Sequence, residues 1–460
     1  MRPFTIVALF STWLWVLPTS GAAHVSERGL VLLLPTDVYT AFGLACVVAT
    51  VVLTVLIPPG VFRAVFGNRV VDPTGLRARW RVPSLVSFVV FFLLVAIGFI
   101  GPRDPLENLL PLAVLSVWWI GLPLVQAIFG DVWSSINPWS GLVALLFGEK
   151  RLLTLPQGFG EWPALATYVL AVGYMISDPA PADPAHLARI ATGYWFFTLL
   201  MCAIFGREWL RRGEGVSLFF GLLARLAPIA ARRPFIRFPG ANVARSERVS
   251  VPLGVFAVAT LALGSFDGLN ETFWWMGILG INPLEFPGRS AVMWPNRMGM
   301  ILAIGALNLA FALTVWIGLS LIGRERKDFG VMFGRLAFTL LPIALGYHVA
   351  HYLTTALVNL QYFALALDDP LNDGAAFLGL ETRYITTSFF NQRHTVEMIW
   401  LTQAGAIVIA HMLAVILSHA IALRAYGTHR AAVVSQLPVA GFMVAYTLFG
   451  LWLLASPVAL

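Results

Sequence analysis

Residues 338–360 read FTLLPIALGYHVAHYLTTALVNL, a run that contains no Asp, Glu, Lys or Arg. A bilayer core about 30 Å thick needs about 20 such residues in a helix, because hydrocarbon offers no partner for a bare backbone amide or carbonyl. The run is therefore long enough to cross a membrane. It also carries His348, His351 and Tyr352, polar groups that a lipid-facing helix would not hold.

Nine further apolar runs lie outward from this one. They cover residues 38–57, 84–100, 109–129, 162–176, 187–205, 251–269, 298–322, 398–423 and 434–454. The chain as a whole is 58% hydrophobic and only 12% charged, with a mean hydropathy of +0.80. A water-soluble fold cannot bury that much apolar surface. We therefore predict an all-α polytopic transmembrane helical bundle of about ten spans, of which 162–176 is the shortest, in contact with a lipid bilayer.

The start of the chain has the pattern of a secretory signal. Arg2 precedes the apolar stretch 4–17, and small residues follow at 20–23, which predicts a signal peptide at 1–23 cut near Ala23. The alternative is an uncleaved first helix, although the stretch is short for a span. Residues 24–460 are predicted to form a single transmembrane domain, because no polar segment is long enough for a core of its own.

The charged residues indicate the orientation of the spans. Arginines and lysines collect in the loops 58–83, 206–250 and 323–337, whereas acidic residues collect in the alternate loops 101–108, 177–183, 267–285 and 368–381. Basic loops stay in the cytoplasm, so the mature N-terminus is expected outside, with Arg289 and Arg297 as exceptions in an outer loop. This predicts a multi-pass protein of a bacterial inner membrane. The net charge of +7 is then a topology signal, and no nucleic-acid partner is expected.

The run 338–360 carries a polar stripe. His348 and His351 are three residues apart and project from one helix face, which continues through Tyr352, Thr355 and Asn359. Such a stripe must face protein or water.

A second stripe lies on the run 398–423. Glu397, His411 and Ser418 are separated by nearly whole turns, and His419 follows them. At about 1.5 Å per residue, His348 and His411 both fall near the middle of the bilayer. Because the two helices are consecutive and antiparallel, a cluster of His348, His351 and His411 is predicted.

Several kinds of chemistry fit such a cluster. Three imidazoles can bind a divalent metal, zinc or copper, and acidify its water. They can equally relay protons, ligate a haem iron, or bond neighbouring carbonyls and hold helices together.

Three further segments carry polar groups. Asp267, beside Gly268 at the end of 251–269, is a candidate carboxylate for the same cavity, although an Asp-Gly pair is also ordinary turn chemistry. The segment 131–139 is predicted to be re-entrant or interfacial. The apolar stretch 216–231, flanked by arginine pairs, is predicted to lie on the cytoplasmic surface.

Several segments resemble one known family. They are FGDV at 129–132, NPW at 137–139, RGE at 212–214, GLLARLAP at 221–228, FDGL at 266–269, HVAHY at 348–352 and SQ at 435–436. Together they resemble the bacterial membrane proteins called fenitrothion hydrolase, the FedB-like type, over most of the chain after the signal peptide. The resemblance implies hydrolysis of a lipophilic phosphotriester.

The leading functional hypothesis combines this resemblance with the histidines. According to this hypothesis, the protein is a metal-assisted hydrolase of lipophilic organophosphorus esters and acts with a partner subunit. Its own Tyr347 or Tyr352 would protonate the leaving oxygen, and its Asp267 would contribute a carboxylate. A secondary transporter or channel for a small solute or metal ion, and a haem- or quinone-linked redox subunit, are the alternatives. The sequence holds no nucleotide-binding loop, serine-hydrolase elbow or Cys-x-x-Cys motif, which disfavours those chemistries.

Overall fold

The computed structural model describes residues 31, 34–66, 81–229, 236–247, 249–285, 287–380 and 384–458. The predicted signal peptide at 1–23 lies outside these residues. The long helices are α3 (Thr36–Leu56), α5 (Arg81–Ile100), α11 (Pro184–Phe205), α15 (Val251–Leu269), α17 (Arg289–Leu321), α19 (Leu341–Asp368), α20 (Arg393–Tyr426) and α21 (His429–Ala455). The shorter ones are α4 (Pro59–Phe66), α6 (Leu109–Pro111), α7 (Leu122–Phe129), α8 (Trp133–Ile136), α9 (Ser140–Leu146), α10 (Trp162–Ser177), α12 (Trp209–Arg212), α13 (Gly215–Leu223), α14 (Ala241–Ala244), α16 (Phe273–Ile278) and α18 (Phe329–Ala337).

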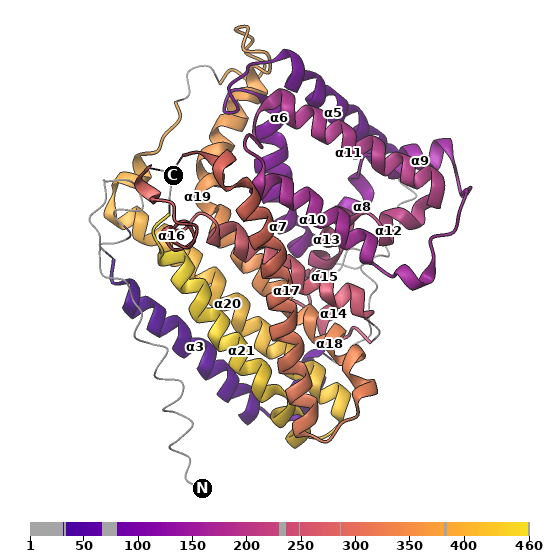
Figure 1. Ribbon diagram of the computed structural model, residues 1–460, viewed down its shortest axis with the longest axis vertical. Coiled ribbons are helices and arrows are strands. Elements are labelled where there is room, and N and C mark those ends of the chain that lie inside the picture. Colours follow the sequence, from indigo (N-terminus) through magenta and orange to yellow (C-terminus); the bar gives the residue numbers. More distant parts are fainter. Residues whose placement is uncertain are drawn as a thin grey trace.

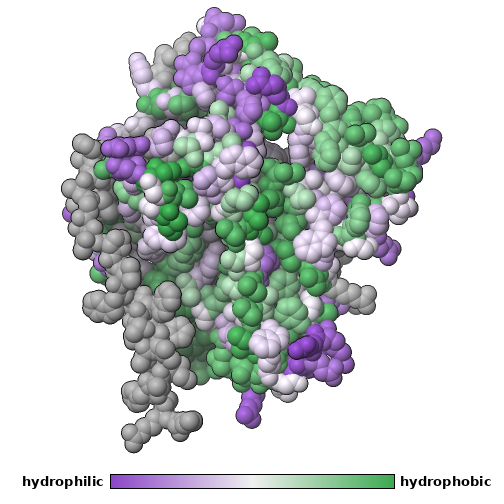
Figure 2. Space-filling view, viewed as in Figure 1, coloured by the Kyte–Doolittle hydropathy of each residue, from purple (hydrophilic) through white to green (hydrophobic). Residues whose placement is uncertain are grey.

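The predicted all-α fold is confirmed, since no β-strand occurs among the described residues. Within them, nine helical segments are long and apolar enough to cross a membrane. The tenth predicted span is α10, an apolar helix of 16 residues, which is shorter than a usual span. Figure 2 shows hydrophobic side chains across the middle of the visible face and hydrophilic ones gathered towards its top and bottom. The chain is therefore a multi-pass helical membrane protein.

The spans that contain α15, α19 and α20 are the most buried of the nine and form the centre of the bundle. Helix α20 packs against α19, α21 and α3, and α15 packs against α17, α18 and α19 (Figure 1). Helices α5 and α11 form a separate pair along one edge, which contacts α6, α9 and α12. The middle of the molecule, between the central bundle and the outer pair, holds α7, α10 and α13.

Loops that the charge pattern assigns to the same side of the membrane lie together. On the side predicted to be outside, Asn372 Nδ2 donates to Glu107 Oε2 at 3.2 Å. On the side predicted to be cytoplasmic, the Arg324 guanidinium lies 5.7 Å from the centre of the Tyr426 ring. These contacts agree with the predicted alternation of the loops.

The prediction that 216–231 lies on the membrane surface is wrong for its described part. Helix α13 is buried and packs against α10 and α7. Its N-terminus is capped by the buried Glu214, whose carboxylate accepts from the backbone N–H groups of Val216 and Ser217 and from the Tyr194 hydroxyl. A helix that is apolar on all sides is more stable inside a protein than at an interface, where one of its faces would contact water. The arginines on either side of the segment led the sequence analysis to the opposite prediction.

The segment 131–139, predicted to be re-entrant or interfacial, is partly buried, with Trp133, Asn137, Pro138 and Trp139 covered. Helices α8 and α9 pack against α5, and Asn137 Oδ1 accepts from the N–H of Ser140 at 2.9 Å in the turn between them. Trp139 Nε1 donates to the Trp195 carbonyl at 3.1 Å. The break after α7 therefore continues as two short helices packed against α5, with Leu145 and Leu146 of α9 exposed.

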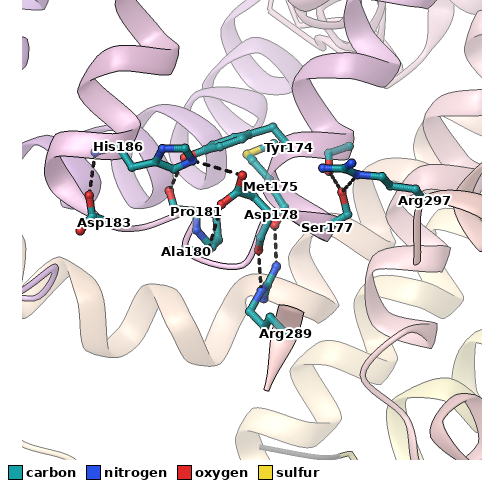
Figure 3. A network of polar contacts seen from close by, with 11 residues as sticks. Tyr174, Met175, Ser177, Asp178, Ala180, Pro181, Asp183, His186, Arg289 and Arg297 are labelled. Atoms are coloured by element: carbon teal, nitrogen blue, oxygen red, sulfur yellow. Dashed lines mark hydrogen bonds and ion pairs between the residues drawn. The ribbon is translucent and has the colours of Figure 1, made fainter. Parts of the chain in front are cut away.

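The two arginines that depart from the charge pattern secure the end of α10 (Figure 3). Arg289 on α17 donates to the carbonyls of Met175 and Ile176 at 2.9 Å each and to that of Asp178 at 3.0 Å. Arg297 Nε donates to Ser177 Oγ at 3.2 Å. Since the last carbonyls of a helix have no partner within it, these bonds explain why two cations lie here.

Candidate functional site

A small cavity lies where α10, α13, α15 and α19 meet the first half of the span 109–129. It offers about 30 Å³ to the centres of water molecules. A water needs at least about 10–15 Å³ on this measure, so the cavity has room for about two. Its lining residues are Trp119, Tyr168, Val172, Phe219, Leu223, Thr260, Leu263, Gly264, Asp267, Ala344, Leu345, Tyr347, His348, His351 and Tyr352.

One wall of the cavity is a connected polar network. Tyr352 donates its hydroxyl to Asp267 Oδ2 at 2.5 Å, and His351 Nε2 lies 3.2 Å from the same oxygen. Trp119 Nε1 donates to the Tyr352 hydroxyl at 3.0 Å. The Asp267 and His351 side chains are 18% and 23% exposed, so the pair is largely enclosed. A carboxylate from one helix is thus paired with an imidazole from another.

The position of Asp267 follows from the packing of α15. Eleven of the 19 residues of this helix are buried, and it continues through Asp267 and Gly268 to Leu269, so the pair does not form a turn. A Cβ on Gly268 would lie 3.2 Å from Leu453 Cδ2 and 3.6 Å from His351 Nδ1. The contact with Leu453 would be tight, whereas the one with His351 would be an ordinary van der Waals distance, so the glycine eases the packing of α15 against α21.

His348 lines the same cavity but has a different partner. Its Nε2 lies 3.3 Å from the Ile120 carbonyl. Ile120 belongs to a π-helical stretch, η2 (Leu112–Gly121), where the wider turn shifts the backbone hydrogen-bond pattern. The His348 ring also packs on Tyr352, with ring centroids 4.8 Å apart. π-helical turns of this kind are frequent at functional sites.

His411 does not join the other two histidines. It is completely buried, and its Nδ1 lies 2.8 Å from the Ile407 carbonyl, one turn earlier in the same helix. No group of three or more His, Cys, Asp and Glu side chains is placed to hold a metal ion within the described parts of the chain. The predicted three-histidine ligand set is therefore not assembled, because the His411 ring folds back onto its own helix.

The remaining polar residues of the two predicted stripes do not line the cavity. Thr355 is exposed, Asn359 is partly buried, and Glu397 accepts from the Tyr39 hydroxyl on α3 at 2.8 Å. Ser418 donates to the Val415 carbonyl of its own helix. His419 lies at the far end of α20, in contact with Phe62 and His429. The two stripes therefore do not form one continuous seam.

Tyr347 and Tyr352 have different relations to the cavity. Tyr352 is bonded to Asp267, whereas the Tyr347 hydroxyl donates to the Tyr446 carbonyl on α21 at 3.2 Å. Of the two tyrosines, only Tyr352 has its hydroxyl in the network of Asp267.

Sequence reasoning missed Trp119, Tyr168 and Thr260. Each lies in an apolar run where an aromatic residue or a threonine is ordinary, so no local signal distinguishes it. The break in regular geometry around Trp119 becomes visible only in three dimensions.

Comparison of the chain with models of protein families, with curated proteins and with solved structures finds no match.

Proposed function

We propose that this protein is a proton-coupled secondary transporter of a small solute, in which Asp267 and His351 form the proton-binding pair. The observation that carries this proposal is the 3.2 Å contact between a carboxylate on α15 and an imidazole on α19, beside a cavity that has room for water. Ionisable side chains inside a membrane protein are costly and mark ion and substrate pathways.

The pairing across two helices supports coupling between protonation and movement. While Asp267 is ionised, it accepts from Tyr352 and attracts a protonated His351. A proton on the carboxylate weakens both interactions and lets α15 and α19 separate. Binding of a solute in the cavity would bias the same movement, which is the thermodynamic requirement for coupling.

The short helices near the cavity also support a transporter. Helix α13 contributes Phe219 and Leu223 to the lining, and it packs against α8, which follows the break after α7. Transporters commonly build their binding sites from discontinuous helices near the middle of the bilayer. The lining is mainly aromatic and aliphatic, with a carboxylate, two imidazoles and a few hydroxyls among it, which favours a small solute that carries a polar group.

Reconstituted protein tests the proposal. Proteoliposomes that contain a trapped pH-sensitive dye are challenged with a panel of sugars, amino acids, short organic acids and small neutral esters. At least one solute should drive a proton flux that Asp267→Asn and His351→Gln abolish. Asp373→Asn and His394→Gln, at exposed positions away from the cavity, should leave it unchanged. No solute-dependent flux, or flux that survives both cavity variants, would refute the proposal.

A hydrolase is the second candidate, favoured by one feature of the same pair. Asp267 fixes the orientation of His351 through a side-chain contact, which is how a carboxylate holds an imidazole that acts as a general base. His351 would take a proton from water as the water oxygen bonds to phosphorus and the aryloxide leaves. Purified protein, with and without a partner subunit, should then release p-nitrophenolate from a p-nitrophenyl dialkyl phosphate, and His351→Gln should not. Absence of this release in both samples removes the candidate.

A further inference from the structure

A second pair of histidines lies at the other end of α20. His419 is on the last turns of this helix and His429 is the first residue of α21, and their ring centroids are 5.8 Å apart with an interplanar angle of 80°. A short turn through Gly427, at φ 74°, joins the two helices. The Phe62 ring covers His419, with ring centroids 5.0 Å apart. The charge pattern assigns this end of the bundle to the cytoplasm.

The hydrogen bonds of His429 fix which nitrogen holds a lone pair. Its Nε2 lies 2.9 Å from the Val55 carbonyl, and a carbonyl can only accept, so Nε2 carries the proton. In the neutral ring, Nδ1 then holds the lone pair, and it is buried without a hydrogen-bond partner among the described residues. An imidazole whose other nitrogen donates to a carbonyl is the usual form of a metal ligand.

His419 offers a second ring nitrogen without a hydrogen-bond partner. The residue is 3% exposed, and its Nε2 is buried and lacks a hydrogen-bond partner in the described parts of the chain. Buried polar atoms are nearly always bonded, so two neighbouring rings that both depart from this rule require an explanation. A bound ion between the rings would explain why neither nitrogen has a partner within the polypeptide.

The geometry points to a binding site for a monovalent copper ion between His419 Nε2 and His429 Nδ1. A metal–nitrogen bond of about 2.0 Å, added to roughly 1.2 Å from ring nitrogen to ring centre, allows two ligating rings to lie up to about 6.4 Å apart. The observed 5.8 Å is within that reach. The site is separate from the cavity of Asp267 and does not depend on the proposed transport.

The number and type of ligands select the ion. Zinc takes four ligands, often with thiolate or carboxylate among them, whereas these rings belong to no larger group of His, Cys, Asp and Glu within the described residues. Imidazole nitrogens suit copper, and copper(I) in particular forms stable complexes with only two ligands, the number that this pair supplies. A single charge also costs less to bury between two neutral rings than a double charge does. The reducing cytoplasm keeps copper in this state.

Titration of the purified full-length protein in detergent tests this site. Under anaerobic, reducing conditions, the protein competes with bathocuproine disulfonate for copper(I). The wild type should retain one ion per chain, and His419→Ala and His429→Ala should each lose it. His394→Ala, an exposed histidine elsewhere, and His351→Ala in the cavity should retain it.

X-ray absorption of the copper-loaded wild type keeps the test independent of how the variants fold. Two nitrogen neighbours near 2 Å, without sulfur, are expected. Three results would each overturn the proposal: no copper retained by the wild type, sulfur ligands in the spectrum, or undiminished copper in His429→Ala. After any of these results, an ordered water that hydrogen-bonds to both ring nitrogens would be the remaining explanation of their burial.

Discussion

The Tyr352 hydroxyl is the centre of the polar network, so its removal tests whether the network stabilises the fold. In Tyr352→Phe, Asp267 loses a 2.5 Å hydrogen bond and Trp119 Nε1 loses its acceptor. A hydrogen bond to a charged acceptor contributes about 1.5–3 kcal/mol, and a buried donor left alone costs about 1–3 kcal/mol. Water in the adjacent cavity recovers part of this loss, so the free energy of unfolding should fall by about 2–4 kcal/mol.

Chemical unfolding in detergent, followed by far-ultraviolet circular dichroism, measures this change. Tyr384→Phe removes a hydroxyl from a side chain that is 91% exposed, and it should change the free energy by less than about 0.5 kcal/mol. The mutation Trp119→Phe should cost less in the Tyr352→Phe background than in the wild type, because the donor that it removes has already lost its partner. A coupling of about 1 kcal/mol is expected. Equal stability of Tyr352→Phe and wild type, or strict additivity with Trp119→Phe, would refute the network.

Three further predictions concern other parts of the structure. Gly318→Ala should lower the free energy of unfolding by about 1–3 kcal/mol, because its Cβ would lie 2.2 Å from the Ser435 carbonyl oxygen. Gly305→Ala on the same helix is the control. Its Cβ meets nothing within 4 Å, so the variant should be neutral or slightly stabilising in the same assay. Arg289→Gln should speed proteolysis between α10 and α11, because three carbonyls at the end of α10 lose their donor. Arg103→Gln, at an exposed position, should leave the rate of proteolysis unchanged. Equal rates for the two variants would show that Arg289 does not secure α10. Burial raises the pKa of Asp369, but backbone N–H groups of Gly374 and Asp373 outweigh this effect and hold the pKa below its usual value. The carboxylate therefore stabilises the loop 369–374 at neutral pH. The protection of its amides, taken relative to the intrinsic exchange rate at each pH, should fall as the pH drops below about 4, and Asp369→Asn should abolish this pH dependence.

Much of the architecture is determined by local sequence. Apolar runs without charge must become helices in hydrocarbon, so nine of the ten predicted spans appear among the described residues as long apolar helices. His348, His351 and Tyr352 were found from sequence because a polar stripe on a helix has to face protein or water.

Tertiary structure decided which of the polar groups meet. Helical spacing tells which residues share a face, but it does not tell how that face is turned towards a neighbouring helix. His411 was predicted to share a seam with His348, yet its ring contacts a carbonyl of its own helix. Asp267, in contrast, lies 84 residues before His351 in the sequence and contacts the imidazole of that residue. Helix α13 is buried for a similar reason: its arginine neighbours are local, but the apolar partners that cover it come from α7 and α10. Contacts between distant segments depend on how the whole helices pack, and the spacing of residues along one helix carries no information about this.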